Sequence, residues 1–149
     1  MRPRANTLGI LFKGGKVLLE ENVARHSKGY GTYYRPIGGT IELGERSQQA
    51  LVREFQEELQ VEVSVLKSLG CLENIYKVKG RIGHEITLLY TVEFVDSSLY
   101  EKESFIMTEG NKITTAKWMD VRDLIEKVVF PDGLIELLEI EFARQMEKV

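Results

Sequence analysis

Cysteine and proline are scarce in this sequence. Of 149 residues, one is cysteine and three are proline. The single cysteine, Cys71, excludes an internal disulfide framework and fits a reducing compartment such as the cytoplasm. Little proline together with 43% hydrophobic residues is typical of a folded protein rather than of a disordered segment. We therefore expect one globular domain over residues 1–149.

Long hydrophobic runs are missing as well. The longest stretch without a charged residue is the eight residues from Ala5 to Phe12, whereas a membrane-spanning helix needs about 20 apolar residues. The net charge is 20 − 23 = −3, which disfavours wholesale binding to nucleic acid or to an anionic membrane. We expect a soluble, cytoplasmic protein with neither a nucleic acid nor a membrane as its partner.

The hydrophobic spacing predicts a mixed α/β domain. A β-hairpin is expected from Thr7 to Leu19, because Gly14 and Gly15 separate two apolar runs and suit a tight turn. The clearest helix covers 47–59, where apolar residues recur every four positions and Ser47 can cap the first turn. Strands are also expected at 33–35, 61–72, 86–95 and 113–119, helices at 120–129 and 134–147, and loops over most of 24–41 and over 74–83 and 96–112.

Three glutamates crowd one side of the helix predicted at 47–59. At about 100° per residue, Glu54, Glu57 and Glu58 fall within an arc of about 100°. Their mutual repulsion costs on the order of 2–3 kcal/mol per pair at ~6 Å and an effective dielectric constant near 20. A hard divalent cation would remove that repulsion, because it prefers oxygen ligands. A solvated acidic face, or an acidic helix that binds a protein partner, is the alternative interpretation.

The loop before this helix offers a partner for its arginine. Arg53 lies beside the glutamates, and an ion pair from Glu45 to Arg53 would hold the loop against the helix. Gly38 and Gly39 lie in the same loop, where they can fold tightly and expose backbone groups to a ligand. The loop and the helix together therefore suit a site whose geometry must be fixed closely.

The spacing of these residues is the most specific signal in the chain. The pattern fixes the residue type at six positions, and the probability of a chance match is roughly 10⁻⁷ per starting position. The six residues are Gly39, Glu45, Arg53, Glu54, Glu57 and Glu58. The segment from Gly39 to Val61 resembles the Nudix box of the Nudix hydrolases. One position departs from that pattern, since Gln60 replaces the usual glycine. Either Gln60 ends the helix in a left-handed conformation, which should cost on the order of 1 kcal/mol, or the helix ends differently.

The resemblance implies an α/β/α sandwich with a mixed β-sheet. It also implies an enzyme that cleaves the pyrophosphate bond of a nucleoside diphosphate linked to another group. The ion would be Mg²⁺, with Mn²⁺ as an alternative, and its ligands would be the carboxylates of Glu54, Glu57 and Glu58 and the backbone carbonyl of Gly38. Glu54 or Glu57 would be the catalytic base, with Glu103 and Glu109 as candidates outside the box. A non-catalytic nucleotide sensor of the same fold is the competing interpretation, and a homodimer is an open alternative to a monomer.

The charge distribution supports a phosphate-bearing small molecule as substrate. Residues 24–41 carry a local charge of +3 and residues 42–62 a local charge of −4. A basic loop beside an acidic, cation-dependent helix suits an anionic ligand that binds through a metal. We predict that Arg25 and Arg35 contact the substrate and that Tyr33 can stack on a nucleobase. Solvated side chains are the alternative, and the identity of the substrate stays open.

Overall fold

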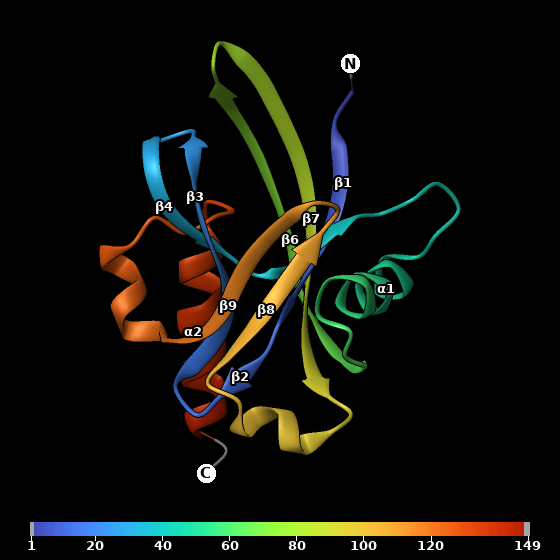
Figure 1. Ribbon diagram of the computed structural model, residues 1–149. Coiled ribbons are helices and arrows are strands. Elements are labelled where there is room, and N and C mark those ends of the chain that lie inside the picture. The colour runs from blue at the N-terminus through green and yellow to red at the C-terminus, as the bar shows by residue number, and fades with distance from the viewer. Residues whose placement is uncertain (1, 148–149) are drawn as a thin grey trace.

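The computed structural model describes residues 2–147, and its strands form two β-sheets (Figure 1). The first sheet has four strands in the order β5-β1-β7-β6. β1 and β7 run parallel, whereas the other neighbours are antiparallel, so this sheet is mixed. Its members are β1 (Arg4–Ile10), β5 (Ile37–Thr40), β6 (Val63–Val78) and β7 (Arg81–Phe94).

The second sheet has five strands, all antiparallel. Its order is β2-β3-β9-β8, and β4 pairs with residues 20–26 of β3, beyond the part that pairs with β2. Only Pro36 separates β4 of this sheet from β5 of the first sheet. The members are β2 (Phe12–Lys13), β3 (Lys16–His26), β4 (Gly29–Arg35), β8 (Ser104–Glu109) and β9 (Lys112–Asp120).

Helices cover both sides of the sheets, as Figure 1 shows. α1 (Ser47–Leu59) packs its buried side chains Leu51 and Phe55 into one core cluster. α2 (Leu134–Glu147) and the 3₁₀ helix η2 (Val121–Glu126) pack into a second cluster through residues such as Leu124 and Leu138. The predicted α/β/α sandwich with a mixed sheet is therefore confirmed.

The first predicted hairpin is half correct. The turn at Gly14 and Gly15 joins β2 to β3, and Phe12 pairs with Val17. The residues before it do not continue that hairpin, because β1 lies in the other sheet and pairs with β5 and β7. The chain changes sheets at the fully buried Leu11, a change that apolar alternation alone cannot reveal.

Two predicted loops are mostly strand. The short strand predicted at 33–35 is the end of β4, but the rest of 24–41 also holds the end of β3, the start of β4 and β5. The segment 74–83 continues β6 and β7 as far as a two-residue turn. Lys79 and Gly80 form that turn with positive φ values of 53° and 76°. Positive φ at both turn residues is typical of a type I′ turn, whose twist matches that of the two strands it joins. Both hairpins have exposed residues along much of their length, so polar side chains are tolerated there and mask the strand pattern.

The remaining segments deviate in smaller ways. The expected loop at 96–112 contains the 3₁₀ helix η1 (Ser97–Glu101) and the strand β8. The helix expected at 120–129 is the shorter η2, although Asp120 caps it by accepting from the backbone N–H of Arg122 at 2.9 Å. The last helix ends as predicted at Glu147.

α1 has the predicted bounds but a different start. Arg46 is the residue before its first turn, and the Gln49 side chain accepts from the Arg46 backbone N–H at 2.9 Å. The predicted cap at Ser47 is wrong, because its hydroxyl lies 2.6 Å from the hydroxyl of Tyr90. Of the two helix ends left open by the sequence, the left-handed one is present, since Gln60 has φ 59° and ψ 38°.

Two further observations concern the surface. Over residues 2–147, the chain contains no helix with the length and apolarity that a membrane crossing requires. Cys71 is exposed on β6.

Candidate active site

The glycine pair of β5 brings the loop and α1 into direct contact. A side chain at Gly38 would collide with the backbone oxygen of Thr7 on the neighbouring strand β1. A Cβ at Gly39 would lie 2.6 Å from the carboxylate of Glu54. Glycine is therefore needed at Gly38, where the neighbour is backbone, and the missing side chain at Gly39 is the space into which the Glu54 carboxylate fits.

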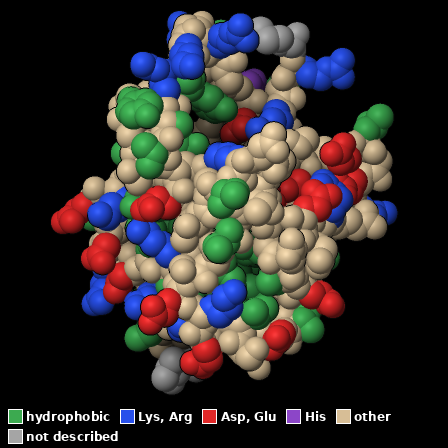
Figure 2. Space-filling model, in the orientation of Figure 1, with side chains coloured by type: hydrophobic (Ala, Val, Ile, Leu, Met, Phe, Trp, Pro, Cys, Tyr) green, Lys and Arg blue, Asp and Glu red, His purple; other side chains and the backbone are tan. Residues whose placement is uncertain are grey.

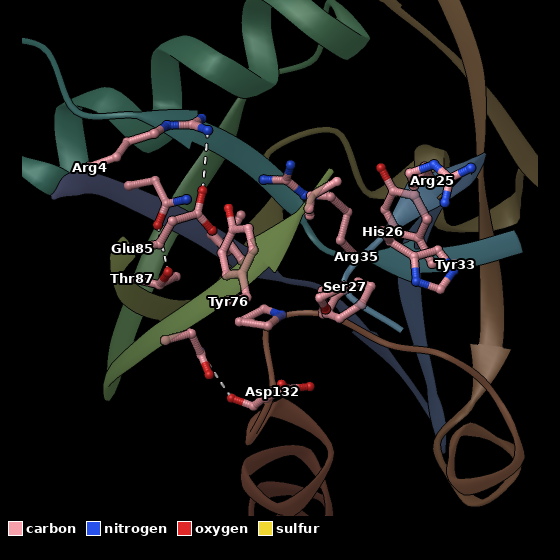
Figure 3. A pocket seen from close by; sticks show the side chains of 16 residues that line it. Arg4, Arg25, His26, Ser27, Tyr33, Arg35, Tyr76, Glu85, Thr87 and Asp132 are labelled. Atoms are coloured by element: carbon pink, nitrogen blue, oxygen red, sulfur yellow. Dashed lines mark hydrogen bonds and ion pairs between the residues drawn. The ribbon is translucent and has the colours of Figure 1, made fainter. Parts of the chain in front are cut away.

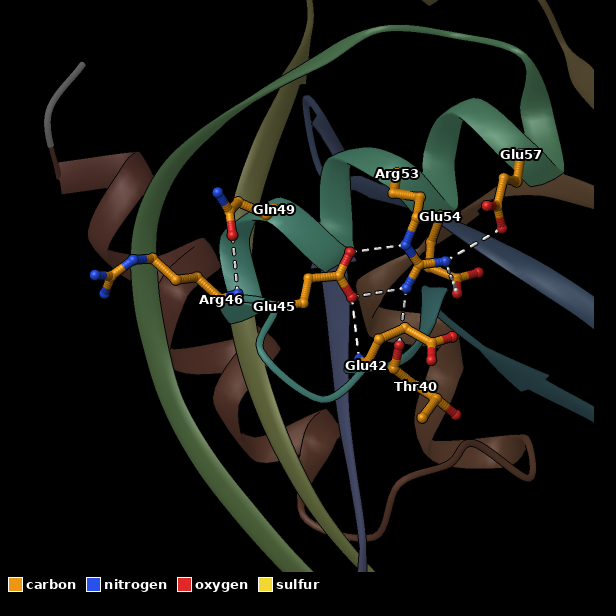
Figure 4. A network of polar contacts seen from close by, with 8 residues as sticks. All are labelled: Thr40, Glu42, Glu45, Arg46, Gln49, Arg53, Glu54 and Glu57. Atoms are coloured by element: carbon orange, nitrogen blue, oxygen red, sulfur yellow. Dashed lines mark hydrogen bonds and ion pairs between the residues drawn. The ribbon is translucent and has the colours of Figure 1, made fainter.

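Arg53 joins the loop to the helix through one guanidinium group (Figure 4). Its Nε and Nη2 atoms donate to the two carboxylate oxygens of Glu45 at 2.8 and 3.0 Å, and Nη2 also donates to the backbone oxygen of Thr40 at 3.1 Å. Hydrogen bonds from Arg53 and from the Glu42 backbone lower the pKa of Glu45 to about 2. The structure thus contains the ion pair that the sequence predicts, in the two-pronged geometry of a strong arginine–carboxylate pair.

The same guanidinium reaches the carboxylates of the helix. Its Nη1 atom lies 3.0 Å from an oxygen of Glu54 and 3.2 Å from an oxygen of Glu57. The Glu57 side chain is 58% exposed, so it points outward along the helix surface. Arg53 thereby offsets part of the repulsion among the glutamates.

Glu58 is the buried member of the predicted trio. It is only 7% exposed, and burial, a hydrogen bond with Glu54 and the negative charge of Glu54 raise its pKa to about 9. The charges of Glu20 and Glu109 act in the same direction. Carboxyl groups from α1, β3 and β8 therefore share one region, and burial of such a group without a cation costs stability.

Glu57 is the exposed member of the trio, and Arg53 links it to Glu54. Within residues 2–147, no three side chains of His, Cys, Asp or Glu are gathered in a ready-made metal cage. Glu54 lies beside Glu58 and also contacts Arg53, whereas Glu57 contacts Arg53 alone among these residues. Binding of one ion by all three carboxylates thus stays a prediction.

Strand β3 contributes two polar residues that sequence reasoning missed. Glu20 accepts a hydrogen bond from the Thr114 hydroxyl at 2.6 Å. Two residues further, Asn22 is 3% exposed, and neither atom of its amide has a hydrogen-bond partner in the described structure. Buried amides normally have partners, so Asn22 has unused capacity near the carboxylates. Neither residue belongs to a motif, and only the strand pairing reveals them.

A pocket opens between the two sheets beside this region. Its volume is about 230 Å³, and the three residues predicted to bind substrate, Arg25, Tyr33 and Arg35, all line it (Figure 3). Figure 2 shows lysine and arginine side chains around a hollow at the upper end of the molecule. The opposite wall comes from the first sheet and was not predicted; it includes Arg4, Asn6, Tyr76, Glu85 and Thr87.

The aromatic rings of the pocket contact one another. The Tyr33 ring meets His26 edge-on, with centroids 5.4 Å apart, and Phe130 at 5.6 Å. Tyr76 lies across the pocket (Figure 3), where burial and the charge of Glu85 raise its pKa. Stacking of Tyr33 on a base is not shown by these contacts and stays a prediction.

Comparison with known proteins gives a family for this arrangement. The model of the NUDIX domain matches residues 2–138. A Mycobacterium tuberculosis protein named "putative mutator protein MutT4" is 29% identical over 94 residues. That match covers 63% of this chain but 35% of the relative, so the chain corresponds to about a third of that protein.

Solved structures share the fold. A NUDIX hydrolase from Nitrosomonas europaea superposes with a TM-score of 0.69 and 17% identity, over 95% of this chain and 90% of that one. An ADP-ribose pyrophosphatase from Streptococcus suis gives a TM-score of 0.62 and 14% identity, over 97% and 92% of the two chains. At these identities the likeness concerns the fold.

Proposed function

Because the chain belongs to the Nudix hydrolase family, we propose that it hydrolyses the pyrophosphate bond of a nucleoside diphosphate linked to another group. In this reaction water adds across the P–O–P linkage and leaves two phosphate-bearing products. The observation that carries the proposal is the buried carboxyl group of Glu58 beside Glu54, whose carboxylate lies against Gly39 of the loop. Helix stability gives no reason for this pair, since repulsion and burial both oppose it.

The residues present fit a divalent metal ion. The site offers only oxygen donors, Glu54 lies in the space left by Gly39, and Glu58 is buried beside it. Such a set suits Mg²⁺ or Mn²⁺, and we propose as ligands Glu54, Glu57, Glu58 and the backbone carbonyl of Gly38. When bound, the ion would neutralise phosphate charge and polarise the bond to be cleaved.

Arg53 is the positioning residue of this site. It contacts Glu45 and the Thr40 carbonyl on the loop and Glu54 and Glu57 on the helix, so it sets the distance between the two. Misplacement of a catalytic group by 1 Å can cost about a hundredfold in rate. We therefore propose that Arg53 acts by holding the carboxylates rather than by touching substrate.

A carboxylate must accept a proton from the attacking water. We propose Glu54 or Glu57 for this role, with Glu109 as the alternative outside the box. Glu109 acts electrostatically on Glu58, whereas Glu103 precedes the opposite end of β8, about 17 Å or more along the strand. The position of Glu109 therefore makes it the better of the two outside candidates.

The proposed substrate is a small anionic nucleotide derivative. The Streptococcus suis neighbour is an ADP-ribose pyrophosphatase, and the pocket of this chain has arginines and aromatic rings suited to a phosphate-bearing nucleotide. We propose that the protein acts in the cytoplasm on this small molecule and not on a nucleic acid. A homodimer remains an open alternative to a monomer.

The test is a panel of diphosphate compounds incubated with the protein, with Mg²⁺, with Mn²⁺ or with chelator, and products identified by mass. We expect metal-dependent cleavage at the diphosphate. Glu57→Gln should lower turnover at least tenfold and leave the circular dichroism spectrum unchanged. Metal-dependent turnover that is equal in the Glu57→Gln variant would remove this residue from the mechanism. Binding of a compound with no cleavage of any would instead support the sensor.

A further inference from the structure

One wall of the pocket between the sheets is polar although it continues a row of core residues. Alternate side chains of a strand lie on the same face, and in this row of β1 the next two, Leu8 and Ile10, belong to a core cluster. Asn6 precedes them in the row and is only 2% exposed, beside Thr87 at 1%. Both polar residues line the pocket. Apolar side chains would avoid the cost of burying these groups, so their presence indicates a function in the pocket.

The amide of Asn6 is held with its donor end free. The Thr87 hydroxyl donates to the Asn6 oxygen Oδ1 at 2.6 Å, which fixes the orientation of the amide. No residue in 2–147 accepts a hydrogen bond from the Asn6 nitrogen Nδ2. Buried amide groups normally have partners. Because Asn6 lines the pocket, its Nδ2 group is available to a ligand there.

Glu85 adds an acceptor beside this donor. It lies two residues before Thr87 on β7, so its side chain is on the same face of the sheet, and it also lines the pocket. Arg4 binds its oxygen Oε2 at 3.3 Å, whereas the other oxygen, Oε1, forms no ion pair with any residue in 2–147. Figure 3 shows Arg4, Glu85 and Thr87 together on this wall. Since Asn6 pairs with Thr87 across the two strands, the Asn6 donor and the Glu85 acceptor can reach one ligand.

Three aromatic rings form the other side of the pocket. His26, Tyr33 and Phe130 contact one another at centroid separations of 5.4 to 5.6 Å and line the pocket. Flat rings suit a flat ligand that stacks on them. The carboxylate of Glu85 would repel a phosphate group at the polar wall. Stacking rings facing a donor and an acceptor therefore fit a nucleobase better than a phosphate or a sugar.

We infer that Asn6 is a specificity-determining residue that reads the edge of a nucleobase. Its Nδ2 group donates to an acceptor atom of the base, and Glu85 accepts from an N–H group beside that atom. Bases taken into protein pockets are read in this way, by hydrogen bonds to their edge and by stacking on their faces. Thr87 is a positioning residue, because its hydroxyl holds the amide. The inference rests on the proposed function, which makes the ligand a nucleotide derivative.

The experiment measures nucleotide binding without divalent metal, which tests the pocket apart from the carboxylate site. The probes are AMP, GMP, CMP and UMP, with ribose 5-phosphate as the compound that lacks a base. Affinities are measured by calorimetry. We expect the preferred nucleotide to bind at least tenfold tighter than ribose 5-phosphate and at least tenfold tighter than the least preferred nucleotide. A hydrogen bond to a charged group has about this worth, and a base that leaves a buried polar group unpaired is rejected.

Asn6→Asp and Asn111→Asp are the matched variants. The first replaces the donor by a second acceptor next to Glu85. Asn111 is exposed in the turn between β8 and β9 and does not line the pocket. Asn6→Asp should reduce the preference among the four nucleotides to less than threefold and leave the affinity for ribose 5-phosphate unchanged, whereas Asn111→Asp should keep the preference.

Thr87→Val is the second test of the same contact. Valine has nearly the shape of threonine but no hydroxyl, so the Asn6 amide loses the group that orients it. The preference should again fall below threefold. This variant carries the test if circular dichroism shows that Asn6→Asp does not fold.

The outcomes separate the two proposals. Equal affinity for all five probes, an unchanged preference in the folded Asn6 and Thr87 variants, or an equal loss in Asn6→Asp and Asn111→Asp overturns the inference about the base. A preference that depends on Asn6, without cleavage of any diphosphate compound, supports that inference and refutes the proposed hydrolysis. Cleavage of nucleoside diphosphate compounds at equal rates for every base, with equal binding, refutes the inference and leaves the hydrolysis standing.

Discussion

Glu58→Gln should make the metal-free protein more stable while it abolishes the activity. Glutamine has nearly the shape of glutamate and can still hydrogen-bond to Glu54, but it has no charge. The folded protein raises the pKa of Glu58 from 4.5 to about 9 through burial and the neighbouring acids. The folded state therefore holds a proton that the unfolded chain releases.

The size and sign of the effect follow from this difference in pKa. The stability associated with Glu58 is full below about pH 4.5 and is lost as the pH rises toward 9, because only the folded state must bind the proton. At pH 8 the difference is 8 − 4.5 = 3.5 pH units, which sets a ceiling of about 5 kcal/mol. Relaxation of the site and entry of water reduce this ceiling, so we expect Glu58→Gln to raise the free energy of unfolding by about 1–3 kcal/mol at pH 8.

The assay is urea denaturation of both proteins in chelator at pH 6 and pH 8. The gain should be larger at pH 8, and the melting temperature should rise by roughly 3–10 °C there. Glu57→Gln is the matched control, because the exposed Glu57 should change the stability by less than about 1 kcal/mol. Added Mg²⁺ should stabilise the wild type more than Glu58→Gln. A variant no more stable than the wild type at pH 8, or a gain that does not grow with pH, would refute the reasoning.

Three further substitutions test other parts of the site. Arg53→Lys keeps the charge but loses the two-pronged contact with Glu45, so metal-dependent turnover should fall at least tenfold; unchanged turnover would contradict the positioning role. Gln60→Gly should raise the free energy of unfolding by about 0.5–1 kcal/mol in urea, because Gln60 adopts a left-handed conformation; a less stable variant would show that its side chain matters more. Gly39→Ala places a methyl group 2.6 Å from the Glu54 carboxylate, so turnover should drop tenfold or more with an unchanged circular dichroism spectrum, and full activity would contradict the contact.

The helix and its carboxylates could be predicted because their determinants are local. Residues four apart on a helix are neighbours whatever the rest of the fold does, so the spacing of Leu51 and Phe55 predicts α1 and its buried face. The Glu45–Arg53 ion pair spans only eight residues. The same locality explains why the left-handed end at Gln60 could be named as one of two alternatives.

The strand pairing could not be predicted in the same way. β1 lies beside β7, which is about 80 residues away in sequence, and no local pattern specifies this neighbour. Polar residues hid the first half of β4 and the paired ends of β6 and β7, because exposed hairpins do not need an apolar face. Glu20 and Asn22 could not be predicted as site residues either, because only the assembled sheet brings Glu20 of β3 toward Glu58 of α1.

The pocket was predicted from one wall only. Arg25, Tyr33 and Arg35 lie within eleven residues of the chain, and their composition indicates a site for an anion. The facing residues Asn6 and Thr87, which share a hydrogen bond of 2.6 Å, come from β1 and β7. Their side chains are ordinary in composition, and only the tertiary structure makes them part of the pocket.

The passage between the two sheets is a single proline. Pro36 follows Arg35 and precedes Ile37, and its ring restricts the backbone at the corner where the chain leaves one sheet for the other. With one backbone torsion fixed at this corner, the end of β4 and the start of β5 have less freedom to change their relative direction than two strands joined by an ordinary residue.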